Sequence, residues 1–333
     1  MDLQEARELA RKKMKGCFVC PECDGKACKG MIPGFGGLRT AKSFLRNVEA
    51  LAEYGLVMRS MDSELDHNPA VTVLVAPVGG VILKSKVPGD PATVEMDYNE
   101  SVSKGAFDAG TLCFTGDGGM EYMFESGIVA SKKREETVIP TIKPRSNDQI
   151  IEKIKVAEKA HAFAVASDID ASTLINMHIF GQPVGPKSAS DIAELVKSTS
   201  LPFIVKGIMS PEEAVACADA GAKGIVVSNH GGRILDGMVG TADVLPEIAK
   251  AVKGRLTIFV DGGVRHGEDV LKMLALGADA VLIGRPVAIA AIGGQAEAVK
   301  LYLDALKREI MDAMMITGVH DLSNVSPDIL RRL

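Results

Sequence analysis

The sequence predicts an α/β fold built as a single (β/α)8 barrel, preceded by a short helical, Cys-rich extension. Eight short apolar runs alternate with helical stretches along the 333 residues. Four of these runs repeat one pattern, in which a helix ends at a small residue or glycine and an apolar strand then ends in polar or glycine-rich residues. The chain contains 34 glycines but only 4% aromatic residues, a composition that suits parallel strands buried on both faces.

The eight expected strands are spaced so that one helix fits between each pair. The four repeats are DAGTLCFTGDGG from Asp108, KAHAFAVASDID from Lys159, DAGAKGIVVSNHGG from Asp219 and ALGADAVLIGRP from Ala275. The other runs are VTVLVAP from Val71, TVIPTIKP from Thr137, LPFIVKG from Leu201 and RLTIFVDGG from Arg255. Eight such units favour a TIM barrel over a doubly wound sheet, which would explain neither the repeat nor the lack of an early GxGxxG motif.

Two of the intervening helices carry clear end signals. The first is expected over Pro211–Ala220, because Ser210 can cap its start together with Glu213 and Gly221 can stop it. The second is expected over Glu268–Leu276, where Gly277 supplies the stop. We expect residues 1–60 to form the extension, packed on the barrel, and residues 61–333 to form the barrel itself.

Charge and hydropathy exclude several classes of protein. The formal net charge is −5 and no basic run occurs, so nucleic acid is not an expected partner. No apolar run approaches the length of a membrane span. The N-terminal stretch MDLQEARELARKKMKG is a charged helix pattern without the apolar centre of a signal peptide. We therefore expect a cytoplasmic protein whose six cysteines are reduced.

Polar and basic residues follow nearly every predicted strand, at the end where barrels hold their active sites. Arg265 and Arg285 follow the seventh and eighth strands, a common phosphate-binding position. The neighbouring Gly262, Gly263 and Gly284 would let backbone N–H groups approach an anion. This end of the barrel is therefore expected to bind a phosphate-bearing cofactor.

A base and an anion clamp are expected in the segment SNHGGR, Ser228–Arg233. His230 is a candidate general base because an imidazole titrates near working pH. Asp170, from a neighbouring strand end, could fix its tautomer. Arg233 could bind a carboxylate in a bidentate pair, and Lys206 could stabilise negative charge on a cofactor ring.

These motifs carry a family resemblance. The stretch from LPFIVKG through VSNHGGRILDG and VDGGVRHGEDVLKMLALGADAVLIGRP to MMITGV resembles the FMN-dependent α-hydroxy acid oxidases and dehydrogenases, such as glycolate and lactate oxidase. The similarity is dense over residues 201–320 and traceable from about residue 40. It implies FMN at the barrel mouth and oxidation of a 2-hydroxy acid to a 2-oxo acid, with His230 as the base and the flavin as hydride acceptor.

The resemblance also implies the role of each site residue. Asp170 would orient His230, Arg233 would bind the substrate carboxylate, and Lys206 would lie at the flavin N1/O2 edge. The residues implied in cofactor binding are Ala76, Pro77, Val78, Gly79, Thr115, Thr141, Asp168, Lys206, Ser228, His230, Asp261, Gly262, Gly263, Arg265, Gly284 and Arg285.

The chain departs from the family pattern at the substrate. The usual N-terminal tyrosine is missing, and Lys143 stands where a second tyrosine is usual. Asp168 replaces a threonine, and STLINMHIFGQPVGP lacks the second carboxylate-binding arginine. Lys143 could replace part of that charge as a substrate-binding cation. We expect the flavin chemistry of the family to be retained, but we do not expect small acids such as lactate to be the natural substrates.

A cysteine cluster precedes the predicted barrel. Cys17, Cys20, Cys23 and Cys28 have the spacing C-x2-C-x2-C-x4-C, which suits either an iron–sulfur cluster or zinc. A reduced loop and a redox disulfide are the alternatives. A bound cluster would favour electron transfer from the flavin to a protein acceptor.

Other functions stay open at this level. Two alternatives are flavoproteins: a flavin-binding redox protein without hydroxy acid turnover, and an FMN barrel similar to isopentenyl diphosphate isomerase. A third alternative is an aldolase barrel that binds no flavin. The sequence leaves the electron acceptor open between O2, a quinone and a protein. The resemblance implies a homo-oligomer, either a tetramer or an octamer.

Overall fold

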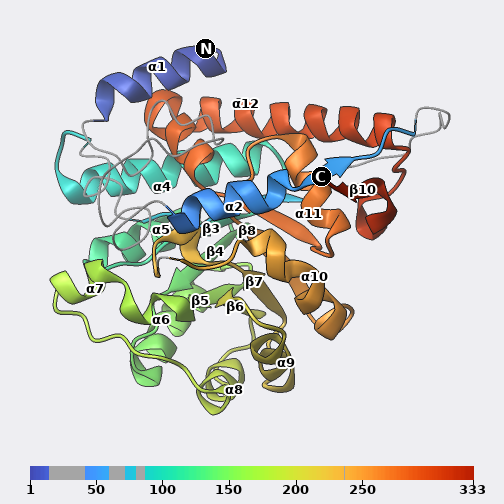
Figure 1. Cartoon of the computed structure of the whole chain (residues 1–333). Helices are drawn as coiled ribbons and strands as arrows, with labels where there is room; N and C mark the ends of the chain where they lie inside the picture. Colours follow the sequence, from blue (N-terminus) through green and yellow to red (C-terminus); the bar gives the residue numbers. More distant parts are fainter. Residues whose placement is uncertain (15–41, 60–71, 80–86, 236) are drawn as a thin grey trace.

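The computed structural model describes residues 1–14, 42–59, 72–79, 87–235 and 237–333, and it contains a closed parallel barrel (Figure 1). The eight barrel strands pair in chain order, and the last closes onto the first. They are β2 (Val73–Val75), β3 (Cys113–Thr115), β4 (Val138–Ile142), β5 (Val165–Asp168), β6 (Phe203–Ile208), β7 (Gly224–Val227), β8 (Thr257–Asp261) and β9 (Ala280–Ile283). The predicted (β/α)8 fold is confirmed.

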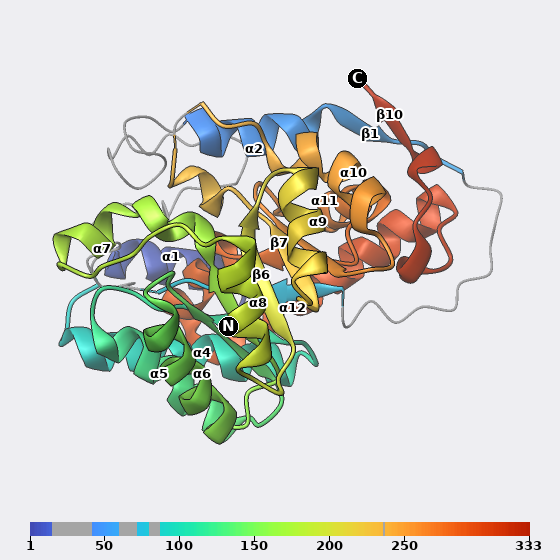
Figure 2. The ribbon, with the colours of Figure 1, turned by 90° about the horizontal axis from the view of Figure 1, so that it is seen from below.

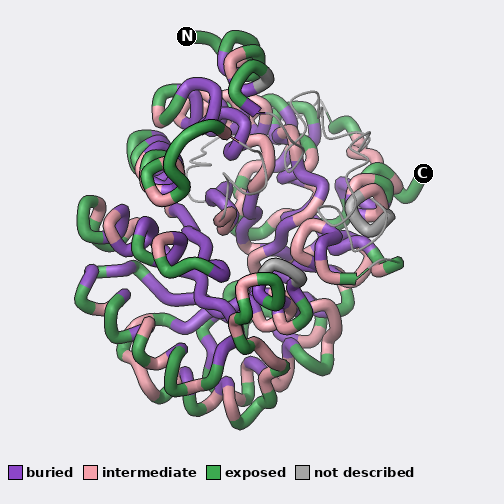
Figure 3. The backbone as a smooth tube through the Cα atoms, turned by 90° about the vertical axis from the view of Figure 1, so that its left-hand side faces the viewer, coloured by how far each residue is buried: buried purple, intermediate pink, exposed green. Residues whose placement is uncertain are grey.

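Helices surround the barrel between successive strands. They are α4 (Pro91–Asp108), α5 (Glu121–Lys133), α6 (Asn147–Lys159), α8 (Ala189–Lys197), α9 (Pro211–Asp219), α10 (Thr241–Val252), α11 (Gly267–Ala275) and α12 (Arg285–Thr317). Shorter elements are η1 (Ile169–Thr173), α7 (Ile175–Ile179), η2 (His230–Gly232), η3 (Leu322–Asn324) and η4 (Pro327–Ile329). Figure 3 shows buried backbone in the interior and exposed backbone on the outer helix faces and loops.

The two helices with clear sequence signals end within a residue of where we expected. The side chain of Ser210 caps α9 by accepting the N–H of Glu213, and Gly221 follows at a φ of +90°. Helix α11 is followed by Gly277 at a φ of +115°. Glycine adopts these left-handed conformations without a Cβ clash, which is why it stops a helix.

Side chains alternate between the lumen of the barrel and the surrounding helices. An apolar layer fills the lower lumen, and within it the rings of Phe114 and Phe259 meet edge to face with centroids 5.9 Å apart. Ile139 and Ala166 belong to the same layer. Positions two or four residues further along each strand therefore face the lumen nearer its C-terminal mouth.

The described parts of the N-terminal extension pack on the barrel. Helix α1 (Leu3–Lys13) lies along α12, which bends at Gly294 and Gln295 (Figure 1). Lys13 donates a hydrogen bond of 2.9 Å to the carbonyl of Ile292 just before that bend. A Cβ on Gly293 would lie 1.8 Å from the carbonyl oxygen of Ala6, so the close crossing of the two helices requires glycine there.

The two ends of the chain meet in a small antiparallel sheet. Strand β1 (Tyr54–Leu56) pairs with β10 (Leu330–Arg332), and α2 (Lys42–Ala52) lies just before β1 and against α10 (Figure 2). The division at residue 60 stays a prediction. Cys17, Cys20, Cys23 and Cys28 lie outside the described residues, so their metal site also stays a prediction. Over the described ranges, no helix combines the length and apolar character that crossing a bilayer needs.

Candidate functional site

A cavity opens at the C-terminal ends of the barrel strands. It encloses about 1040 Å³, including open solvent at its mouth. Most of the predicted site residues line it: Ala76, Pro77, Val78, Gly79, Lys143, Asp168, Lys206, His230, Arg233, Asp261, Gly262, Gly263, Arg265, Gly284 and Arg285. Asp170 and Ser228 contact His230 and Lys206 respectively. Barrel topology alone brings these sequence-distant residues together.

A row of alternating charge crosses the mouth of the lumen. The register of β4 and β5 places Lys143 beside Asp168, and Asp168 is in turn the partner of Lys206. The Lys143 ammonium forms an ion pair with Asp168 Oδ2. Lys206 Nζ lies 3.2 Å from Asp261 Oδ2 and donates a 2.7 Å hydrogen bond to Ser228 Oγ. Each buried ammonium therefore has a carboxylate partner, as buried charges require.

Lys206 remains charged despite its burial. Burial lowers the pKa of its ammonium, but the carboxylates of Asp261, Asp170 and Asp168 together outweigh that effect and raise the pKa above its usual value. A permanent positive charge thus stands on the lumen floor. Such a fixed charge can stabilise negative charge that develops on a bound group.

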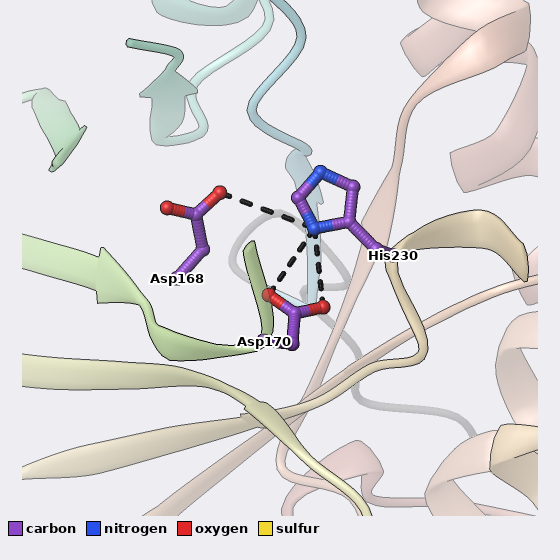
Figure 4. Close-up of side chains that lie close together, drawn as sticks. All are labelled: Asp168, Asp170 and His230. Carbon is purple, nitrogen blue, oxygen red and sulfur yellow. Dashed lines mark hydrogen bonds and ion pairs between the residues drawn. The ribbon is translucent and has the colours of Figure 1, made fainter. Parts of the chain in front are cut away.

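His230 is held in an unusual backbone conformation. It has a φ of +58° and is followed by Gly231 at +64° and Gly232 at +76°, so three consecutive residues have positive φ. His230 Nδ1 lies 3.1 Å from Asp170 Oδ2, 3.2 Å from Asp170 Oδ1 and 4.0 Å from Asp168 Oδ2. Figure 4 shows both carboxylates on the Nδ1 side of the ring. A non-glycine residue at positive φ is strained, and such strain occurs often at functional sites.

An irregularity in β6 makes room for Asp170. The register of β6 with β7 shifts between Lys206 and Ile208, and Gly207 between them has a φ of +99°. A Cβ on Gly207 would lie 2.5 Å from the Cβ of Asp170. The glycine after Lys206 is therefore needed both for the bulge and for the approach of Asp170 to His230.

The electrostatics favour a neutral imidazole. Burial lowers the pKa of His230 well below its usual value, and the cations Lys143, Lys206 and Arg233 lower it further, while Asp168 acts in the opposite direction. With Nδ1 facing the Asp170 carboxylate, the ring donates from Nδ1 and keeps Nε2 as an acceptor. This is the protonation state that a general base needs.

The His230 loop is anchored by a residue that the sequence analysis missed. Asn47 of α2 and Asn229 exchange two hydrogen bonds, both of 2.8 Å. Asn229 Oδ1 also accepts the N–H of Gly232 at 3.1 Å, and Asn47 Oδ1 accepts that of Thr241 at 3.1 Å. Nothing in the local sequence around Asn47 marks this role, because its partners lie far away along the chain.

The same asparagine packs against the turn after β8. Gly262 and Gly263 have φ values of +108° and +82°. A Cβ on Gly263 would lie 2.8 Å from the carbonyl oxygen of Asn47. These two glycines, which we expected for anion binding, are thus also required by the packing of α2.

Cations predominate in the cavity lining. Among the lining residues, Lys143, Lys206, Arg233, Arg265 and Arg285 outnumber three acids, Asp117, Asp168 and Asp261. Arg285 Nη2 donates a 3.0 Å hydrogen bond to the carbonyl of Gly231. Burial, followed by the charge of Arg285, lowers the pKa of Arg233 to about 10. The charge of a bound anion would stabilise the charged guanidinium and offset both effects, so the cavity suits a negatively charged ligand.

Three of the predicted cofactor contacts, Thr115, Thr141 and Ser228, are not among the residues that line the cavity. Thr115 lies on the outer face of β3, where a Cβ on Gly127 of α5 would come within 2.4 Å of its hydroxyl. The prediction that Thr115 contacts the cofactor is therefore wrong, because strand alternation turns it away from the lumen. Thr141 shares the lumen face of β4 with Ile139 and Lys143, and its buried hydroxyl lacks a hydrogen-bond partner within the described ranges.

A buried ion pair braces the loop after β3. Asp117 forms an ion pair with Arg145, which also donates a 2.7 Å hydrogen bond to the carbonyl of Gly118. Asp117 additionally accepts the backbone N–H of Lys143 at 3.0 Å. Asp117 is the acidic residue of the glycine-rich segment that follows β3, and no local sequence pattern marks Arg145 as its partner.

The outer wall of the cavity is apolar. Leu174, Met177, Phe180 and Met123 line it, and Met177 is fully buried. Leu174 and Met177 pack with Ala171 in a small apolar cluster beside Asp170. This wall lies in the same cavity as His230 and Arg233, so it can contact the apolar part of a ligand held by them.

Comparison with known proteins points to one family. Residues 128–332, more than half of the chain, match the family described as FMN-dependent dehydrogenase. The L-lactate dehydrogenase of Caulobacter vibrioides is 50% identical over 142 residues, which are 42% of this chain and 37% of that protein. The L-lactate dehydrogenase of Xanthomonas campestris pv. campestris is 53% identical over 133 residues, 40% of this chain and 34% of that protein. The matched segment thus spans little more than a third of these relatives.

Solved structures agree over nearly the whole chain. A mandelate oxidase with benzoyl-formic acid superposes with a TM-score of 0.76 at 26% identity, covering 99% of this chain and 97% of that one. A Pediococcus acidilactici protein assigned as a lactate oxidase gives a TM-score of 0.77 at 25% identity, covering 100% of this chain and 95% of that one. With the site residues in one cavity and the family match over residues 128–332, the chain belongs to the FMN-dependent dehydrogenases.

Proposed function

We propose that this protein oxidises a 2-hydroxy acid to the 2-oxo acid with FMN as its cofactor. The observation that carries the proposal is the pairing of His230 Nδ1 with Asp170 at 3.1 Å in a cavity that Arg233 also lines. A neutral imidazole with a carboxylate behind it is an oriented general base. A buried guanidinium beside it is suited to a carboxylate.

The residues present are suited to FMN. Asp261 lines the cavity, and its Oδ1 is buried without a hydrogen-bond partner in the described ranges, so a polar ring edge or a ribityl hydroxyl would satisfy it. Arg265 and Arg285 would hold the phosphate, and Ala76–Gly79 would line the ring. FMN, when bound, supplies the acceptor for two electrons.

His230 would remove one proton from the substrate. Its Nε2 accepts that proton, because Nδ1 faces Asp170. Asp170 would then stabilise the imidazolium by accepting from Nδ1–H. The second hydrogen leaves the substrate with the electron pair, so the carbon–oxygen single bond becomes a carbonyl. Arg233, together with Lys143, would hold the carboxylate during this step.

The apolar wall supports a substrate larger than lactate. Leu174, Met177 and Phe180 lie in the cavity where the side chain of a bound acid would point away from the cations. Each methylene buried there contributes about 0.8 kcal/mol. We propose a 2-hydroxy acid with a branched or aromatic side chain, and we expect its kcat/KM to exceed that of lactate by roughly tenfold or more.

Anaerobic reduction of the bound flavin tests the proposal. The FMN-loaded protein is mixed with glycolate, lactate, 2-hydroxyisocaproate and mandelate, and the loss of oxidised-flavin absorbance is followed for each. Rapid bleaching by at least one acid is expected. If FMN stays bound and oxidised with every acid, the protein is a flavin-binding redox protein without hydroxy acid turnover. Efficient lactate oxidation with a low KM would overturn the substrate assignment alone.

A further inference from the structure

One carboxylate oxygen lies between a lysine and the proposed base. Asp168 Oδ2 forms the ion pair with Lys143 and lies 4.0 Å from His230 Nδ1. The Lys143 and Asp168 side chains are only 7% and 4% exposed. Asp168 Oδ1 has no hydrogen-bond partner among the described residues. The negative charge of Asp168 near the imidazole is therefore neutralised mainly by Lys143, and solvent screens it little.

Asp168 is placed to assist a charged imidazole. Asp170 makes the direct contact with Nδ1, and Asp168 adds a second negative charge on the same side of the ring (Figure 4). A nearby negative charge stabilises the imidazolium, and a nearby positive charge destabilises it. While Lys143 is bound to Asp168, the two charges largely cancel at His230.

Lys143 also faces the ligand. It lines the cavity together with Arg233 and His230, so a carboxylate held there competes with Asp168 for its ammonium. The side chain of lysine is long and flexible and carries its charge at a single point, so it can change partners without moving the backbone. Asp168, at the end of β5, is fixed by the barrel and cannot follow.

We propose that Lys143 and Asp168 form a substrate-operated charge switch for His230. In the free enzyme Lys143 neutralises Asp168. The carboxylate of the bound 2-hydroxy acid draws the ammonium away, and the uncovered Asp168 then stabilises the imidazolium that forms when His230 accepts the proton. Asp168 is thus a positioning residue that acts through His230. The proposal rests on the proposed oxidation of a 2-hydroxy acid.

The other charged groups around His230 do not provide this switch. Lys206, on β6, already has two partners, the carboxylate of Asp261 and the hydroxyl of Ser228. Arg285 contacts the carbonyl of Gly231, next to the base. Asp170 contacts Nδ1 throughout, and Arg233 holds the substrate carboxylate. Lys206 and Arg233 lower the pKa of His230 as Lys143 does, but it is Lys143 that is ion-paired with Asp168, whose charge raises that pKa.

Removing Lys143 should therefore raise the pKa of His230, and removing Asp168 should lower it. The FMN-loaded variants Lys143→Met and Asp168→Asn are compared with wild type, and the rate constant of anaerobic flavin reduction is measured against pH. We expect the apparent pKa of the acidic limb, taken at limiting substrate, to rise by about one unit in Lys143→Met and to fall in Asp168→Asn. Substrate Kd should rise about tenfold or more in Lys143→Met only, which is the loss of one charged contact.

A double variant and two controls complete the test. Lys143→Met with Asp168→Asn removes both charges, which avoids leaving a buried carboxylate or ammonium unpaired, and the two pKa shifts should largely cancel. Lys143→Arg should retain tight substrate binding. Lys253→Met removes an exposed lysine that pairs with Asp279 and should change neither quantity.

Shifts in the same direction, or none in either single variant, would overturn the switch. The ring protons of His230, titrated by NMR in the oxidised FMN-loaded protein, report the same opposite shifts without turnover. A protein that no hydroxy acid reduces but that shows these NMR shifts would refute the proposed function and retain the Lys143–Asp168 antagonism. Reduction by a hydroxy acid without the opposite shifts would refute only the switch.

Discussion

Asn47 and Asn229 hydrogen-bond to each other in both directions, with two contacts of 2.8 Å between side chains 182 residues apart in the sequence. This amide pair fastens α2 to the loop that carries His230. Both amides are buried, so their polar atoms need partners within the protein, and this pair supplies two of those hydrogen bonds.

We therefore expect Asn47→Ala to destabilise the fold and to weaken the anchoring of the loop that carries His230. Deleting the amide leaves the buried N–H of Thr241 without its acceptor and removes both hydrogen bonds to Asn229, at a cost of about 1–3 kcal/mol in the free energy of unfolding. Urea denaturation monitored by circular dichroism measures this loss. Glu49→Ala, on the exposed side of α2, is the control. Equal stability of Asn47→Ala and Glu49→Ala would contradict the anchoring role.

His230→Ala should separate flavin binding from flavin reduction. The variant loses the general base, and such a base contributes about 10²–10⁴-fold to rate. Stopped-flow reduction under anaerobic conditions should slow by that factor, while the visible spectrum of bound FMN persists. Reduction at the wild-type rate would show that another group takes the proton.

The pH dependence follows from the depressed pKa of His230. Its folded-state pKa lies well below the ordinary value, so the unfolded chain binds more protons in the interval between the two. The contribution of this group to stability is present above a pH of about 6.5 and is lost as the pH falls toward the folded pKa. Thermal denaturation across this interval should show a smaller loss on acidification in His230→Gln than in wild type. Identical slopes would contradict the depressed pKa.

Two substitutions of Arg233 separate the contribution of its charge to substrate binding from that of its bidentate geometry. Arg233→Lys retains a cation but loses the bidentate fork, and Arg233→Met loses both. We expect KM for the hydroxy acid to rise in both variants and most in Arg233→Met, by roughly a hundredfold or more for a charge-assisted contact. Steady-state kinetics with a hydroxy acid and its product 2-oxo acid as inhibitor would check this. An unchanged KM in Arg233→Met would place the carboxylate elsewhere.

The barrel was predictable because its signals are local. Each apolar run, such as that ending in Lys206 or Asp261, indicates a buried strand by its composition alone. Eight such strands alternating with helices are compatible with few topologies. The strand-end location of His230 and Asp170 followed from that topology. The family resemblance added roles that spacing alone does not give.

What the sequence left unpredicted depends on register and distant contacts. In the sequence Thr115 ends its strand as other site residues do, yet the alternation of side chains along β3 turns it toward Gly127. Lys143 and Asp168 were both identified, but their pairing follows from the register of β4 and β5. Asn47 and Arg145 find their partners only when the chain has folded, and no local pattern distinguishes them from other polar residues.

The Lys143–Asp168 pair also constrains how such an enzyme can change over evolutionary time. Replacing either residue alone leaves a buried charge without its partner, and breaking a buried pair in this way lowers the free energy of unfolding by about 3–5 kcal/mol. That is a large share of the stability of a typical domain. A lineage exchanging these positions would therefore need the two substitutions in close succession, or a stabilising change beforehand, so that a new substrate preference depends on an earlier surplus of stability.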